Sequence, residues 1–191
     1  KLFPVKYPQV MKRIMDIILD NPGMIINMDD LSSEIGITRQ TISDYLEYLE
    51  AGYLIKKLYN FSKNRLTSEK KQKRYYPVIT SSSLYYGHED IGKIVESLCI
   101  NFLEAEFFWR TPQKDEIDII YENEKQLIPI EVKYRTSFGL PKALLKFGKQ
   151  FSVDEGFVIT ANKSETKVVS DFKIRYIPIV KFLRDHDLFY L

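Results

Sequence analysis

Two acidic residues and a lysine lie on two neighbouring predicted strands, and these residue types together can support metal-dependent hydrolysis. Asp118 lies in the segment EIDIIY (116–121), and Glu131 and Lys133 lie in LIPIEVKY (127–134). Carboxylate oxygens at a site open to water suit Mg²⁺ or Mn²⁺. Such an ion would act as a Lewis acid and hold the attacking water. The lysine ammonium would orient that water or offset charge that develops on a phosphate oxygen.

The pairing of these two strands can be predicted from their alternating pattern. A polar turn at 123–125 separates them, which predicts an antiparallel hairpin. The apolar residues would then form one continuous face, with Ile117 opposite Val132, Ile119 opposite Ile130 and Tyr121 opposite Ile128. The other face would place Asp118 opposite Glu131 and Glu116 opposite Lys133. Directly opposed carboxylates repel each other, so one must be protonated, both must splay into water, or a cation must lie between them.

A plainer interpretation of the same pattern is a half-exposed sheet, in which charged residues alternate with isoleucines for no catalytic reason. The predicted elements around the hairpin favour a defined domain over a half-exposed sheet alone. Apolar spacing predicts a helix over about 91–103, before the hairpin, and a helix over 141–151 after it. A short buried strand at 156–160 follows, and a closing strand at 174–180 and a helix at 181–188 complete the chain.

Asp118, followed after twelve residues by Glu131-Val132-Lys133, resembles the D…E-x-K motif of the PD-(D/E)XK nucleases, and the helix-strand-strand-helix-strand order is similar to their core. The resemblance implies that Asp118 and Glu131 are metal ligands, with the Val132 carbonyl as a third, and that Lys133 is the catalytic lysine. It also implies that Glu96, on the preceding helix, is an outer acid. The proline that precedes the aspartate in the family motif is absent, and no glutamine extends E-x-K, which puts turnover in doubt more than metal binding.

The first half of the chain has a different organisation. Apolar residues at helical spacing predict a helix over 7–20, ended by Asn-Pro-Gly, and a second helix over 28–35 that Gly36 can close in a left-handed conformation. Thr38 suits the N-cap of a third helix over 39–51, and a strand over 53–58 follows Gly52. This order is what a winged helix requires. The stretch from Tyr7 to about Thr80 resembles the winged helix-turn-helix family.

That resemblance implies that the helix over 39–51 enters the major groove of DNA. Its outward N-terminal residues would meet base edges at Arg39, Gln40, Ser43 and Asp44, with Thr38 near a phosphate. Acidic residues on the same helix leave open a different use, in which the helices dock on a protein.

A basic segment follows the predicted strand. Between Phe61 and Tyr76 there is one acidic residue, Glu69, and the basic residues are Lys63, Arg65, Lys70, Lys71, Lys73 and Arg74. On a chain whose net charge is only +2, such a concentration is a footprint for phosphates, although charged loops are often merely solvated. By the winged-helix resemblance, this segment would be the wing.

The whole-chain properties are those of a globular protein with two small domains, which we place at 1–86 and 87–191. We expect an α/β (α+β) fold that combines the winged helix with a restriction-endonuclease-like αββαβ domain on a mixed sheet. No membrane span is expected, and the single cysteine, Cys99, fits a reducing cytoplasm. A homo-oligomer is compatible with these properties.

The two halves in this order resemble the C-terminal half of certain archaeal and bacterial AAA-type ATPases. Segments that carry the resemblance include KRYYPVI, IGKIVESL, FFWRT, IPIEVKYR and YIPIVKFL. The chain has no G-x-x-x-x-G-K-[ST] motif and begins with Lys1, so we expect any ATP-binding domain to lie upstream. The sequence therefore predicts a DNA-binding module with a metal-dependent nuclease-like domain. The alternative is a catalytically inactive DNA-binding or protein-docking tail of such an ATPase.

Overall fold

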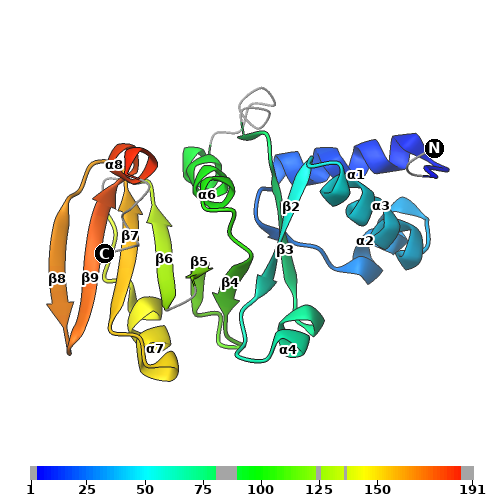
Figure 1. The fold of residues 1–191 in the computed structure, drawn as a ribbon. Coiled ribbons are helices and arrows are strands. Elements are labelled where there is room, and N and C mark those ends of the chain that lie inside the picture. Colours follow the sequence, from blue (N-terminus) through cyan, green and yellow to red (C-terminus); the bar gives the residue numbers. More distant parts are fainter. Residues whose placement is uncertain (1–3, 81–89, 124–125, 136, 186–191) are drawn as a thin grey trace.

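One mixed sheet runs through the protein in the computed structural model, which describes residues 4–80, 90–123, 126–135 and 137–185. Within these ranges the sheet has nine strands in the order β1-β3-β2-β4-β5-β6-β7-β9-β8. Helices α1, α2 and α3 gather beyond one end of the sheet, whereas α6, α7 and α8 lie along the rest of it (Figure 1). This mixed α/β architecture confirms the predicted fold class.

The first part of the chain has the element order expected of a winged helix. Its elements are α1 (Pro8–Asp20), β1 (Met24–Ile25), α2 (Met28–Ile35), α3 (Arg39–Ala51), β2 (Ile55–Asn60) and β3 (Lys73–Pro77). Gly36 ends α2 at φ 75°, and the Thr38 hydroxyl accepts the Thr41 N–H at the start of α3. Both details were predicted, because a left-handed residue and a hydroxyl cap are what two helices joined by a tight turn need.

The basic segment between β2 and β3 differs from the expected wing. It contains a short helix, α4 (Arg65–Lys70), whose N-cap Asn64 accepts the Thr67 N–H. The following basic residues belong to β3, which pairs with both β1 and β2. The segment therefore has its own capped helix, which the predicted wing did not include.

The second part has the expected helix-strand-strand-helix-strand order with one additional strand, β4, between the first helix and the hairpin. The elements are α6 (Ile91–Phe102), β4 (Phe107–Arg110), β5 (Glu116–Glu122), β6 (Leu127–Lys133), α7 (Lys142–Phe151), β7 (Glu155–Thr160), β8 (Glu165–Val169), β9 (Phe172–Pro178) and α8 (Ile179–Arg184). Strands β6, β7 and β9 are parallel, and β8 is an antiparallel edge strand. The last helix begins two residues earlier than predicted, and residues 186–191 lie outside the described residues.

Two apolar clusters cover the two faces of the second part. Helices α6 and α8 pack on one face, against residues such as Ile119, Ile130 and Val132. Helix α7 packs on the other face, with Phe147 and Trp109 at the centre of that cluster. Because successive side chains of a strand point to opposite faces, these clusters show which way each strand residue points.

The two halves of the chain are joined by strand pairing. The Tyr59 N–H donates to the Glu106 carbonyl at 2.8 Å, and β2 and β4 are parallel. The Asn60 side chain donates to the Arg110 carbonyl and accepts from the Arg110 N–H, both at 3.0 Å. The sheet is therefore continuous across the expected boundary between residues 86 and 87.

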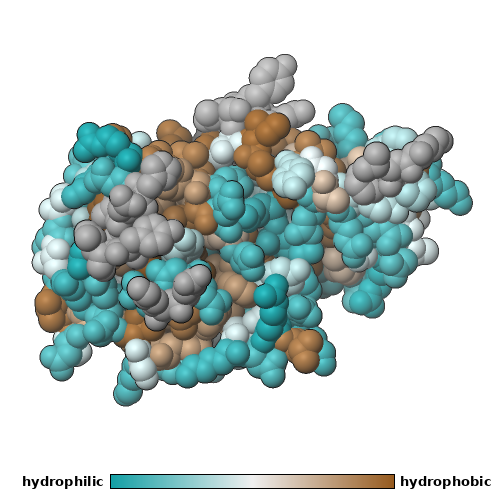
Figure 2. Space-filling view, viewed as in Figure 1, coloured by the Kyte–Doolittle hydropathy of each residue, from teal (hydrophilic) through white to brown (hydrophobic). Residues whose placement is uncertain are grey.

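None of the helices in the described ranges is long and apolar enough to cross a membrane. Hydrophilic residues cover much of the face shown in Figure 2, and apolar residues interrupt them in separate places.

Candidate functional site

The hairpin that carries the acidic residues has the predicted register over most of its length. Ile119 pairs with Ile130, and Tyr121 pairs with Ile128. Over these residues the predicted alternation holds, because Ile119, Ile128 and Ile130 all pack in the cluster under α6.

A β-bulge changes the start of β5. Phe107 of β4 pairs with Ile120, but Trp109 pairs with Ile117, so β5 has one more residue than β4 across this interval. Ile117 consequently packs in the cluster under α7, whereas Ile119 packs under α6. The prediction that Ile117 faces Val132 on one continuous apolar face was wrong, because the bulge reverses the alternation.

The bulge also changes how Asp118 and Glu131 meet. Strand alternation places Glu131 on the α7 side, because its neighbours Ile130 and Val132 both pack on the α6 side. Asp118 instead reaches across to β6, where its Oδ2 accepts the Val132 N–H at 2.8 Å. The predicted direct opposition of Asp118 and Glu131 is therefore not among the strand pairs, and Asp118 instead contacts the β6 backbone at the residue after Glu131.

Asp118 is buried, with 9% of its surface exposed. Burial raises the pKa of its carboxyl to about 7, and the charge of Glu96 adds to this effect. Lys133 and the Val132 N–H act in the opposite direction. The fold therefore holds a carboxyl group whose pKa lies near neutral pH, because the surrounding positive groups compensate its negative charge only in part.

Lys133 connects this carboxyl to Glu131. Its ammonium lies 3.1 Å from Glu131 Oε2. Burial lowers the pKa of Lys133, but the charges of Asp118 and Glu131 outweigh burial and raise it. Burial raises the pKa of Glu131, with Lys133 opposing the shift. The lysine is thus within electrostatic reach of both acids, as the E-x-K spacing predicted.

Glu96, the expected outer acid, lies inside the protein with 5% of its surface exposed. The Tyr76 hydroxyl donates to its Oε1 at 2.7 Å, and Lys93 donates to its Oε2 at 2.8 Å. Arg74 Nη1 lies 3.6 Å from the same carboxylate. Its position beside Asp118 agrees with the helix placement that the sequence predicted, but its oxygens already have partners.

Arg74 is the clearest correction to the predicted DNA-contacting residues. It is 5% exposed, forms ion pairs with Glu96 and Glu116, and lies over the Phe108 ring at 4.9 Å. Burial lowers its pKa, but the neighbouring acidic groups raise it by more. Its side chain cannot reach a phosphate from a wing, because it crosses from β3 into the second half of the protein.

Acidic and basic groups around Asp118 are equal in number. The acids are Glu96, Glu116, Asp118 and Glu131, and the bases are Arg74, Lys93, Arg110 and Lys133. We call these eight residues the acid cluster. Glu116 pairs with Arg74 and Arg110, so its expected position opposite Lys133 does not lead to an ion pair between these two residues.

The donor set fits one kind of metal site. Among the described residues, no group of three or more acidic, histidine or cysteine side chains is placed to hold an ion. Two carboxylates, Asp118 and Glu131, and the Val132 carbonyl remain. Mg²⁺ commonly keeps several waters and uses one or two carboxylates, and an acid with a raised pKa is relieved by a cation. The set therefore suits a hydrated Mg²⁺ or Mn²⁺ and not a fully protein-ligated one.

The residues expected at the DNA-facing end of α3 are exposed or half-buried. Arg39 pairs with Asp29 at 3.0 Å, Gln40 donates to Asp44 at 2.7 Å, and Thr38 is used as the helix cap. Ser43 lines a hollow between α3 and β2. Arg39 and Gln40, which the sequence predicted to read bases, would have to exchange these partners for any nucleic-acid contact.

The remaining basic residues lie on the surface around α4. Lys63, Arg65 and Lys70 are exposed. Lys71 donates to the Phe61 carbonyl, and Lys73 donates to the Glu69 carbonyl while its ammonium lies 5.8 Å from the centre of the Tyr59 ring. Arg74 is buried and does not contribute to this surface, but the other five basic residues of the segment still gather around α4.

Sequence reasoning identified neither Arg74 as a member of the acid cluster nor Tyr76 as a hydrogen-bond donor to it. The signal was present in the segment KRYYP, where an arginine lies within a strand of aromatic residues. An arginine at such a position is expected to be paired, because burial of an unpaired charge is costly. Its partners are distant in sequence and could not be read from the strand itself.

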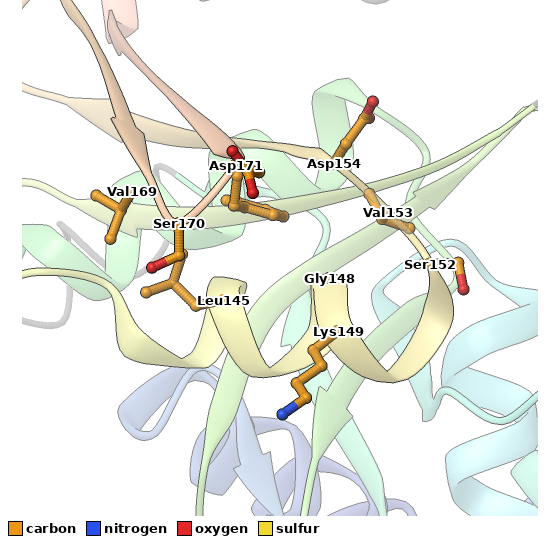
Figure 3. A pocket seen from close by; sticks show the side chains of 10 residues that line it. Leu145, Gly148, Lys149, Ser152, Val153, Asp154, Val169, Ser170 and Asp171 are labelled. Atoms are coloured by element: carbon orange, nitrogen blue, oxygen red, sulfur yellow. The ribbon is translucent and has the colours of Figure 1, made fainter.

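A surface pocket of about 600 Å³ lies away from the acid cluster, between α7 and the β8–β9 turn. Figure 3 shows Lys149 pointing away from Asp154 and Asp171, so these charged groups do not converge on one point. The acid cluster remains the candidate site.

Two family models match separate parts of the chain. Residues 1–79 match the family described as "Domain of unknown function (DUF8612)", and residues 91–182 match the family described as "Domain of unknown function (DUF4143)". The chain is 41% identical over 70 residues to the UPF0102 protein FP2501 of Flavobacterium psychrophilum. That match covers 32% of this chain and 58% of the relative. No solved structure matches. The DUF4143 match agrees with the resemblance to C-terminal regions associated with AAA-type ATPases.

Proposed function

We propose that this protein is a nucleic-acid-binding module with a metal-dependent, nuclease-like second half, and that it forms the C-terminal part of an AAA-type ATPase whose ATP-binding domain lies upstream. The observation that carries the proposal is the buried Asp118 carboxyl beside the Glu131–Lys133 ion pair. The partial match to a UPF0102 protein supports a nuclease-like domain, and the DUF4143 match supports the ATPase context.

Each residue of the site would have a separate task. Asp118, Glu131 and the Val132 carbonyl would hold Mg²⁺ or Mn²⁺, which supplies Lewis acidity and lowers the pKa of a bound water. The Val132 N–H keeps Asp118 in place through Oδ2. Lys133 would leave its ion pair with Glu131 and contact the attacking water or a phosphate oxygen. The charge of Glu96 would keep the pKa of Asp118 raised, so that a bound cation is favoured there.

Binding of nucleic acid would involve the first half. The N-terminal end of α3 supplies Thr38, Arg39, Gln40 and Ser43 for the groove. The basic surface around α4 supplies Lys63, Arg65, Lys70, Lys71 and Lys73 for the backbone, and affinity should fall steeply with salt.

A nuclease assay on the whole chain tests the catalytic proposal. With Mn²⁺ or Mg²⁺ the wild type should cleave DNA, and Lys133→Ala or Asp118→Ala should reduce the rate roughly 100-fold or more. Lys167→Ala is the matched control, because Lys167 is a partly exposed lysine of the edge strand β8, paired with Glu165. Equal activity in all four proteins would identify a contaminant and remove the catalytic claim.

A second candidate is a binding tail without catalysis, and the equal number of acids and bases in the acid cluster favours it. Replacing Lys70 and Lys71 by glutamine should weaken DNA binding and reduce the salt slope by about two. Glu131→Ala should leave binding unchanged. Absence of any nucleic-acid affinity at low salt would indicate instead that the surface docks on a protein.

A further inference from the structure

Arg74 and Tyr76 belong to β3, within the 1–79 family match, yet their polar groups contact acid-cluster residues of the second half. Arg74 Nη1 donates to the Tyr76 hydroxyl at 3.3 Å, and that hydroxyl donates to Glu96. The other end of the guanidinium meets Glu116. The first half therefore supplies the most deeply buried cation of this cluster.

This placement has a direct electrostatic consequence for a divalent ion. Arg74 is close enough to Asp118 for the two charges to affect each other, and it is almost free of solvent screening. Like charges in such surroundings repel strongly, so a guanidinium that already compensates the acids reduces what a metal can gain there.

The environment of Arg74 also indicates why it stays in place. Its ring contact with Phe108 and its two acidic partners hold it, and among the described residues its buried Nε lacks a hydrogen-bond partner. A buried donor without a partner is costly, so the remaining contacts of the guanidinium must outweigh that cost.

We propose that Arg74 is a built-in counter-cation that sets the divalent-metal affinity of the acid cluster, so that the first half of the protein controls metal loading of the second. Arg74 is thus a positioning residue that acts through Glu96 and Glu116. The inference rests on the proposed metal site but does not require that the site be catalytic.

Mn²⁺ binding to the full chain, followed by the electron paramagnetic resonance signal of the free ion, tests this role. Arg74→Met should bind Mn²⁺ roughly tenfold tighter than the wild type or more, because one buried positive charge is lost. Arg74→Lys keeps the charge and should stay within about threefold of the wild type. Arg110→Met removes the other arginine of Glu116 from a more exposed position and should also change the affinity by less than about threefold.

Several outcomes separate the possibilities. Equal or weaker Mn²⁺ binding by Arg74→Met, or an equal gain in Arg110→Met, would overturn the inference. If Arg74→Met does not fold alone, millimolar Mn²⁺ should restore a cooperative unfolding transition, because a ligand of the native state stabilises it; failure to do so would also overturn it. Mn²⁺ binding by the wild type with no gain in Arg74→Met would leave the proposed metal site standing, whereas no binding by any variant would remove both.

Discussion

Replacing Asp118 by asparagine should stabilise the protein, and the gain should grow as the pH rises from about 4 to about 8. Burial and the Glu96 charge raise the pKa of Asp118 to about 7, from its ordinary value of 3.8. The folded protein therefore retains a proton that the unfolded chain has lost. The associated stability is fully present below the unfolded pKa and disappears as the pH rises through the folded pKa.

The size of the effect follows from the separation of the two pKa values. At about 1.4 kcal/mol for each pH unit, the wild type should lose roughly 4 kcal/mol that Asp118→Asn keeps. Asparagine has a side-chain oxygen that can still accept the Val132 N–H, so the bond that holds position 118 can survive the substitution.

Urea unfolding of both proteins, in EDTA and at one-unit pH intervals, measures this difference. The Glu96→Gln background is the control: without the Glu96 charge, the pH-dependent part of the gain from Asp118→Asn should shrink. If the difference in unfolding free energy between wild type and Asp118→Asn is constant with pH, or falls as the pH rises, then the pKa of Asp118 is not raised in the folded protein.

Three further predictions concern the fold that supports the site. Gly23→Ala should cost about 2 kcal/mol or more in urea unfolding, because φ is +82° and the added Cβ would lie 2.8 Å from the Tyr76 ring; Gly139→Ala, with no atom within 4 Å of its Cβ, should change stability by less than about 0.5 kcal/mol. Thr38→Ala should lower the free energy of unfolding by about 1 kcal/mol, since it removes the cap of α3, and Thr38→Ser should recover most of it. Phe147→Ala should cost about 3–5 kcal/mol, because this ring is fully buried against Trp109 and Phe151, and an unchanged midpoint would contradict the assigned core under α7.

The regular elements could be predicted closely because their signals are local. Helix α3 begins and ends where the apolar period and the Thr38 cap predicted. The hairpin register followed from the alternation of isoleucines with charged residues, and β7 differs by one residue from the predicted strand. In each case the information lies within one segment of the chain.

The parts that were missed depend on distant segments. The bulge in β5 is defined by its pairing with β4, where β5 has one extra residue, and the sequence of β5 alone does not reveal this pairing. Burial of Arg74 requires Glu96 and Glu116, which are 22 and 42 residues away in the sequence. Strand β8 is mostly exposed and therefore lacks the alternating pattern by which strands are recognised.

The pairing of β2 with β4 has a practical consequence for anyone who divides this protein. A cut near residue 86 would leave each fragment with an unprotected strand edge, at Tyr59–Asn60 in one and Phe107–Phe108 in the other, where backbone groups have lost their partners. Such edges recruit other chains, so we expect the separated pieces to aggregate even where each keeps its own helices. A chimera that contains either piece should fold only if it also includes the strand, β2 or β4, that pairs with that piece.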